Sequence, residues 1–172
     1  MVGDRLDAKG WAMMTLSVPS TLALAAALGS GLMAGLYFAF SICVMEALGR
    51  VRPAQGIAVM QAINVSILNV TFASVFGGTA LVALGSAVMA VIEVGWVGSG
   101  YSILGAAAYL IGSLGLTLAY HVPRNEALAR LDPEAPDAVS CWARYRSEWT
   151  SGNHARVLAS LLATVAFVLA AG

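Results

Sequence analysis

The chain has 172 residues, of which 59% are hydrophobic and 10% charged, and its nine basic and nine acidic residues cancel. Soluble domains carry about 25% charged residues, so a soluble fold of this composition could not cover its own surface. Zero net charge offers no basic surface to a nucleic acid, and no nucleic-acid partner is expected. The composition therefore predicts one integral membrane domain, residues 1–172, that lies in a lipid bilayer.

Four apolar segments reach the length of about 18–20 residues that a membrane-spanning helix needs. The predicted spans are residues 19–48, 57–92, 102–122 and 153–170. Pro19 suits the first turn of a helix, and Gln61, Asn64 and Asn69 interrupt the apolar character of the second span. Long continuous apolar runs exclude a β-barrel. The sequence predicts an all-α, integral membrane four-helix up-down bundle.

The connections between the spans differ in length and charge. Loop one, residues 49–56, is short, whereas loop three, residues 123–152, holds much of the charge together with several aromatic residues. We expect a short amphipathic helix at the membrane interface over about residues 138–150, before the fourth span. An aromatic belt at the lipid headgroups is the alternative.

Basic residues predict the orientation of the bundle. Six arginines lie on the side of loops one and three: Arg50, Arg52, Arg124, Arg130, Arg144 and Arg146. Arg5 and Lys9 lie on the side of the termini. The positive-inside rule then places loops one and three in the cytoplasm, and a bacterial inner membrane is the expected location.

Small residues along the first span indicate close helix packing. Gly31 and Gly35 have the spacing at which two helix backbones approach closely. The pattern is compatible with packing inside the bundle and also with a homo-oligomer.

Polar residues of the spans gather at the end of the bundle formed by loops one and three. They are Ser41, Cys43, Glu46, Gln61, Asn64, Ser66, Asn69, His121, Asn125, Asn153, His154 and Arg156. Polar groups in a bilayer are costly and usually face the interior or a cavity. This end is therefore the predicted location of a functional site.

Several of these residues also have a structural interpretation. Glu46 could pair with Arg50 at i+4, and Asn153 could cap the fourth helix. Asn64 and Asn69 could bond to neighbouring helices. Each interpretation stays open beside the functional one.

The two histidines of the chain, His121 and His154, are expected at adjoining helix ends. They could ligate a haem iron, or they could hold a metal ion together with Glu46. They could equally move protons without any cofactor, or simply be hydrogen-bonded structural residues. The sequence leaves the cofactor open between haem, a metal ion and none.

Four stretches resemble the anthrone-oxygenase-like family of small integral membrane proteins. These are FAFSICVMEAL, MQAIN, HVPRNEAL and, most specifically, WARYRSEWTSGNHARVLASLLA. The resemblance extends over nearly the whole chain. Pro123 and Asn125 keep the family pattern at the end of the third span, whereas His121 stands where asparagine is usual.

The resemblance implies an oxygenase that converts an electron-rich, anthrone- or polyketide-like aromatic to a quinone with molecular oxygen. His154 would be the base, and the other expected catalytic residues are His121, Arg156 and Asn64. Substrate contacts are expected from Asn69, Asn125, Asn153, Trp149 and Glu46. The expected pocket lies between the helices at the cytoplasmic end and is lined by Asn64, His121 and His154.

Two other function classes stay open at this stage. One is a non-catalytic membrane protein that binds or transports a quinone or drug-like molecule, with Glu46 as its charged site. The other is a small accessory subunit in which the polar residues only hold helices together.

Overall fold

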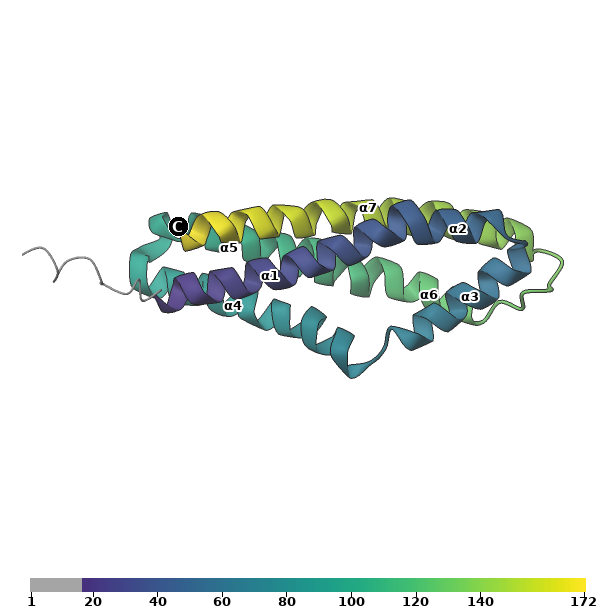
Figure 1. Ribbon diagram of the computed structural model, residues 1–172, viewed down its shortest axis with the longest axis horizontal. Coiled ribbons are helices and arrows are strands. Elements are labelled where there is room, and N and C mark those ends of the chain that lie inside the picture. Colours follow the sequence, from purple (N-terminus) through teal and green to yellow (C-terminus); the bar gives the residue numbers. More distant parts are fainter. Residues whose placement is uncertain (1–16) are drawn as a thin grey trace, which may run out of the picture.

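The computed structural model describes residues 17–172, and four of its helical segments are long and apolar enough to cross a membrane. They are Val18–Arg50, Val70–Gly98, Gly100–Ala129 and Ala138–Ala171. Successive segments run in opposite directions, so the first begins and the last ends at the same end of the bundle (Figure 1). The predicted all-α membrane bundle is confirmed. Arg5 and Lys9, used above for the orientation, lie outside the described residues.

The first segment consists of α1 (Val18–Ala39), the π-helix η1 (Phe40–Val44) and α2 (Met45–Arg50). The Oγ of Ser17 caps α1 by accepting a hydrogen bond from the backbone N–H of Ser20, and Pro19 lies in the first turn as expected. Within η1 the hydrogen bonds widen to i→i+5, a local change that frequently marks functional sites.

The second segment is broken. Helix α3 (Pro53–Ser66) and helix α4 (Val70–Gly98) meet at an angle at residues 67–69 (Figure 1). The expected single span over 57–92 is therefore wrong. The side chain of Asn69 stabilises the break from both sides, because its Nδ2 donates to the Ser66 carbonyl at 2.9 Å and its Oδ1 accepts from the Phe72 N–H at 3.0 Å. Asparagine is a preferred residue for starting a helix in this way.

The third segment starts directly after α4. Near the end of α4 the helix is kinked at Gly95, which adopts a φ of 74° that few other residues tolerate. The third segment consists of α5 (Gly100–Ala107), the π-helices η2 (Ala108–Gly115) and η3 (Thr117–His121), and α6 (Val122–Ala129). It continues past its predicted end at residue 122. Pro123 does not stop it, because this proline lies in the first turn of α6 and follows a π-helical turn.

The fourth segment is the single helix α7 (Ala138–Ala171). Residues 138–150 are helical as expected, but the prediction that they form a separate interfacial helix is wrong. Gly152 does not interrupt the helix, and the ring of Tyr120 packs on it. At 34 residues, α7 is about 51 Å long, whereas the hydrocarbon core is about 30 Å thick. Its first turns therefore extend out of the hydrocarbon core.

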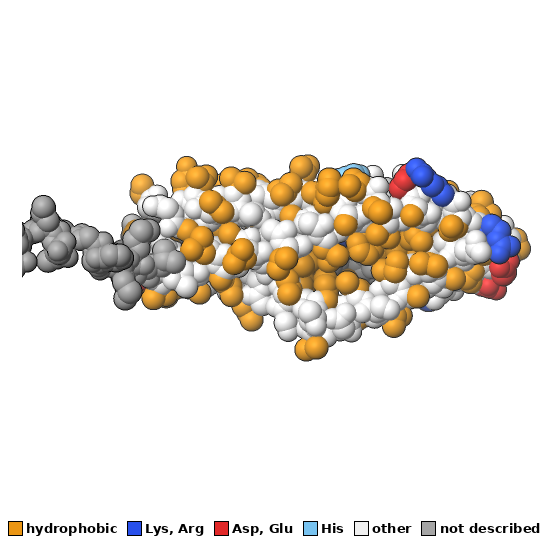
Figure 2. All heavy atoms as spheres, viewed as in Figure 1, with side chains coloured by type: hydrophobic (Ala, Val, Ile, Leu, Met, Phe, Trp, Pro, Cys, Tyr) orange, Lys and Arg blue, Asp and Glu red, His pale blue; other side chains and the backbone are white. Residues whose placement is uncertain are grey.

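The two ends of the bundle differ in composition. Charged side chains gather at the end where α2 and α3 meet, which we call the charged end, while hydrophobic side chains cover most of the remaining surface in view (Figure 2). The opposite end, where α1 begins and α7 ends, we call the terminal end. This distribution is that of an integral membrane protein.

Small residues allow the helices to pack closely near the terminal end. A Cβ on Gly29 would clash with Thr79 of α4, and one on Gly112 would clash with Ala159 of α7. A Cβ on Gly31 would lie 3.8 Å from Thr164, which is an ordinary contact, and one on Gly35 would meet nothing within 4 Å. The predicted homo-oligomer remains a hypothesis.

Candidate functional site

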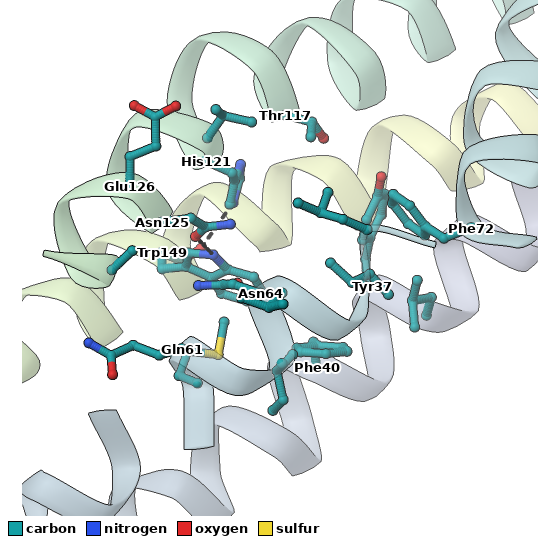
Figure 3. Close-up of a pocket in the computed structure, with 18 of the residues that line it drawn as sticks. Tyr37, Phe40, Gln61, Asn64, Phe72, Thr117, His121, Asn125, Glu126 and Trp149 are labelled. Carbon is teal, nitrogen blue, oxygen red and sulfur yellow. Dashed lines mark hydrogen bonds between the residues drawn. The ribbon is translucent and has the colours of Figure 1, made fainter. Parts of the chain in front are cut away.

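A cavity of about 340 Å³ lies inside the bundle toward the charged end, beside the break between α3 and α4. Its apolar wall includes Leu36, Phe40, Met60, Phe72 and Trp149. Its polar wall includes Asn64, Thr117, His121 and Asn125 (Figure 3). Arg156 also lines the cavity. A volume in the range of roughly 300–1,000 Å³, with apolar walls and a few polar groups, is typical of small-molecule sites.

The rim of this cavity is apolar where the second segment breaks. Val65 and Leu68 line the cavity and are also 75% and 80% exposed on the outer surface. On the side of the charged end the rim carries Glu126, which is exposed. An opening between exposed apolar side chains would face the lipid, so a hydrophobic molecule could enter from the bilayer.

Arg156 is the buried cation of the cavity, with only 5% of its surface exposed. Its Nη1 donates to the Thr117 hydroxyl at 3.1 Å, and its Cζ lies 4.3 Å from the ring centroid of Tyr37. Its Nε has no hydrogen-bond partner in the described chain. The two ion pairs between described residues, Arg50–Glu46 and Arg124–Glu148, do not include it. Arg156 is thus a buried charge without a counterion among residues 17–172.

Asn153 holds Arg156 in place. Its Oδ1 accepts from Nη2 of Arg156 at 2.7 Å, and its Nδ2 donates to the Tyr37 carbonyl at 2.6 Å and to the Ser41 hydroxyl at 2.7 Å. These bonds tie α7 to the junction between α1 and η1. The interpretation of Asn153 as a helix cap is wrong, because it lies fully buried in the middle of α7. Asn153 does not line the cavity itself, so it acts on the site by holding Arg156 in place.

His121 is 1% exposed, and each of its ring nitrogens faces a backbone carbonyl. Nδ1 lies 3.2 Å from the Leu116 oxygen and Nε2 lies 3.3 Å from the Trp149 oxygen. A neutral imidazole has one N–H, so it can donate to only one of the two. The second nitrogen keeps a lone pair, which faces the other carbonyl oxygen.

Two amide side chains complete the polar wall. The Oδ1 of Asn125 accepts from the Tyr145 hydroxyl at 2.9 Å and from Nε1 of Trp149 at 3.0 Å. Both donors on one oxygen fix the orientation of the amide. The Nδ2 of Asn64 is buried and has no partner in the described chain.

Three other expected site residues lie outside the cavity. Glu46 is exposed and pairs with Arg50 at 3.0 Å, as its structural interpretation predicted. Asn69 is exposed and caps α4. His154 is exposed and lines a separate surface depression with Glu46 and Arg146.

The expectation that His154 lines the pocket with Asn64 and His121 is wrong for a geometric reason. Residues two positions apart in an α-helix point about 200° apart around its axis. Because Arg156 points into the bundle, His154 points out of it.

Haem and metal binding find no support in the donor set around His121. No three side chains of His, Cys, Asp or Glu within residues 17–172 form a group that could hold a metal ion. His121, on η3, lines the cavity on the inner side of α7, whereas His154 lies on the outer side of α7. In addition, both ring nitrogens of His121 face backbone carbonyls.

Sequence reasoning did not assign most of the apolar cavity wall to the site, and among the residues that it missed are Tyr37, Phe40, Phe72 and Thr117. Phe40 belongs to η1 and Thr117 to η3. A π-helical turn shifts the residues that follow it to another face of the helix, and no simple sequence pattern announces such a turn. Only the polar character of Thr117 in an apolar stretch gave a signal.

Comparison with known proteins gave one result. The family described as anthrone oxygenase matches residues 66–166, which is more than half of the chain. These residues contain most of the polar cavity wall, including His121, Asn125 and Arg156. The comparisons with curated proteins and with solved structures gave no match.

Proposed function

Because the chain belongs to the anthrone oxygenase family, we propose that it is a membrane oxygenase that converts a hydrophobic, anthrone-like aromatic to a quinone with molecular oxygen. The observation that carries this proposal is Arg156, a buried cation that lines an apolar cavity and has no counterion in the described part of the chain. Such a site is complementary to an apolar molecule that carries, or develops, a negative charge on one oxygen.

The cavity suits a planar aromatic ligand. Phe40, Phe72 and Trp149 supply ring faces and edges against which a flat ring system can pack. The apolar rim at Val65 and Leu68 would admit it from the bilayer, where such a molecule dissolves.

The overall reaction balances without a further reactant: one anthrone and one O2 give one anthraquinone and one water. It begins with the loss of a proton from the methylene carbon, and the electron pair of that C–H bond then delocalises onto the ketone oxygen. This enolate is the electron-rich species that O2 oxidises. Oxygen is the only oxidant that the reaction needs.

Arg156 would stabilise the enolate, because its unpaired Nε–H can donate to the oxyanion inside an apolar cavity. Fixed donors of this kind are worth about 10²–10³ in rate. Thr117 and Asn153 keep the guanidinium in place, so it need not reorganise as the charge develops.

His121 would accept the proton at the ring nitrogen that carries no hydrogen, after that nitrogen turns from its backbone carbonyl toward the ligand. It takes the role first expected of His154, since His154 lies outside the cavity.

The proposed location is a bacterial inner membrane with loops one and three in the cytoplasm. The support is the set of arginines at the charged end, in agreement with the positive-inside rule. The cavity would then lie near the cytoplasmic side of the bilayer.

Oxygen consumption and quinone formation from anthrone by the detergent-purified protein test the proposal. The decisive variant is Arg156→Gln, with Arg144→Gln as its control, because Arg144 is an exposed arginine on the same helix. We expect turnover to fall about 10²–10³-fold in Arg156→Gln and to be unchanged in the control. A protein that only binds its ligand, the alternative function, would consume no oxygen above the uncatalysed rate.

A further inference from the structure

We propose that the cavity recognises its aromatic ligand at two separate oxygen atoms, one at Arg156 and a second at Asn64 and Asn125. The preferred ligands are therefore polycyclic aromatics with a second carbonyl or hydroxyl oxygen distant from the first. The inference rests on the proposed function for the aromatic nature of the ligand and for the role of Arg156.

Two buried N–H groups of the cavity have no hydrogen-bond partner within residues 17–172. One is Nε of Arg156 on α7, and the other is Nδ2 of Asn64 on α3. Buried polar groups in proteins are nearly always hydrogen-bonded, so each exception calls for an explanation. Both groups are donors, and a ligand that satisfies them must offer acceptor atoms.

The second position is organised by neighbouring side chains. The Tyr145 hydroxyl donates to Oδ1 of Asn125. Its oxygen also interacts with the side chain of Asn64, although Nδ2 of Asn64 forms no hydrogen bond of good geometry within the described chain. Trp149 donates to the same Oδ1 through Nε1. With its oxygen occupied by two donors, Asn125 has its Nδ2 left for another acceptor. Asn64 and Asn125 together would present N–H groups to one oxygen atom.

Trp149 separates the two positions. Its indole has Asn125 bonded at Nε1 and the Arg156 guanidinium 5.2 Å from its ring centroid. Figure 3 shows Asn64 and Asn125 close to Trp149, with Tyr37, which contacts Arg156, farther along the cavity. A ligand that reaches both positions must carry its oxygen atoms on different parts of a ring system, as a quinone does.

Gln61 provides a matched control on the same helix. It also lines the cavity through an amide, but its Nε2 already donates to the carbonyls of Leu128 and Leu131 at 2.8 and 2.9 Å. Removing this amide costs bonds within the protein, whereas the Nδ2 of Asn64 has no such bond to lose.

The test is equilibrium binding of two probes under anaerobic conditions, so that no turnover is needed. The probes are anthrone, with one oxygen, and 9,10-anthraquinone, with two oxygens on opposite sides of the central ring. Binding is followed by quenching of tryptophan fluorescence in wild-type protein, Asn64→Leu and Gln61→Leu. Asn64→Ala serves as a second variant should the leucine not fit.

The affinity for anthraquinone relative to that for anthrone should fall about tenfold from wild type to Asn64→Leu, which is the effect of one lost hydrogen bond. This ratio should keep its wild-type value in Gln61→Leu. An unchanged ratio in both Asn64 variants, or an equal fall in Gln61→Leu, would overturn the inference. The expected fall in the ratio, together with no oxygen consumption by the wild type, would instead contradict the proposed function alone.

Discussion

The two ends of the bundle use different residues to fill their interiors. The core near the terminal end is built mainly from small residues, with Ala23, Ala26, Ala83 and Ala163 fully buried around Phe167. The core at the charged end is built from Trp142, Tyr145, Trp149 and large aliphatic side chains. Small residues bring helix backbones together and leave little space between them.

At the charged end, bulky rings hold the helices apart and the second segment breaks, and the cavity lies there. Among residues 17–172, the buried side chains near the terminal end include no ion or amide, whereas Arg156, His121 and Asn153 are all buried toward the charged end. The proposed chemistry is thus separated along the axis of the bundle from the closely packed small residues. Substitutions at the two ends should consequently affect different measurements.

The largest effect is expected from His121→Gln. Loss of a proton acceptor should lower the rate of quinone formation about 10²–10⁴-fold with little change in the affinity for anthraquinone, measured in parallel. The control is His154→Gln, which changes an exposed histidine outside the cavity. Equal activity in both variants would remove His121 from the mechanism.

Phe167→Ala addresses the terminal end. Phe167 is fully buried against Gly105, so the variant leaves a void and should lower the free energy of unfolding by about 3–5 kcal/mol. Anthraquinone affinity should stay within about twofold, since Phe167 does not line the cavity. Phe38→Ala, which removes an exposed ring from the same membrane-spanning bundle, is the control. A large loss of affinity in Phe167→Ala would mean that the two ends are coupled.

Gly152→Ala tests whether activity depends on the close contact of α7 with Tyr120 and His121. A Cβ there would lie 2.5 Å from Cε1 of Tyr120 and 3.0 Å from Cε1 of His121, so both rings must move. We expect turnover to fall about tenfold, because a displacement of a catalytic group by a fraction of an ångström already costs rate. The matched control is Gly77→Ala, where a Cβ meets nothing within 4 Å; the same loss there would argue against the contact.

The smallest effect is expected from Asn69→Ala. Removal of the cap at the break should lower the free energy of unfolding by about 1 kcal/mol, and Asn69→Asp should keep most of it. Turnover per folded protein should not change, because Asn69 does not line the cavity. A clear loss of turnover with unchanged stability would restore Asn69 as a substrate-binding residue, as first expected.

The fold was predictable to the level of four membrane segments, because composition and apolar length report directly on lipid exposure. The break at residues 67–69 was not predicted, since Asn69 was interpreted as a polar residue inside a span and not as a helix cap. The sequence around it, with β-branched Val65, Ile67 and Val70 beside Asn69, does favour such a break.

Five of the residues expected at the site line one cavity: Asn64, His121, Asn125, Trp149 and Arg156. Their roles stay predictions. The error at His154 came from starting a new helix at residue 153. Continuous α7 buries Trp142, Tyr145, Trp149, Asn153 and Arg156 on one face, a helical periodicity that was visible in the sequence. That periodicity would have placed His154 on the opposite face.

The most direct test of the central claim is the absorption spectrum of anthrone bound to the protein under anaerobic conditions. The enolate has a continuous aromatic system that the ketone lacks, so it absorbs at longer wavelength. Wild-type protein should hold bound anthrone as the enolate, and Arg156→Gln should bind it as the ketone. A ketone spectrum in the wild type, or an enolate spectrum of equal strength in Arg156→Gln, would contradict the assignment of Arg156 as the oxyanion-binding residue.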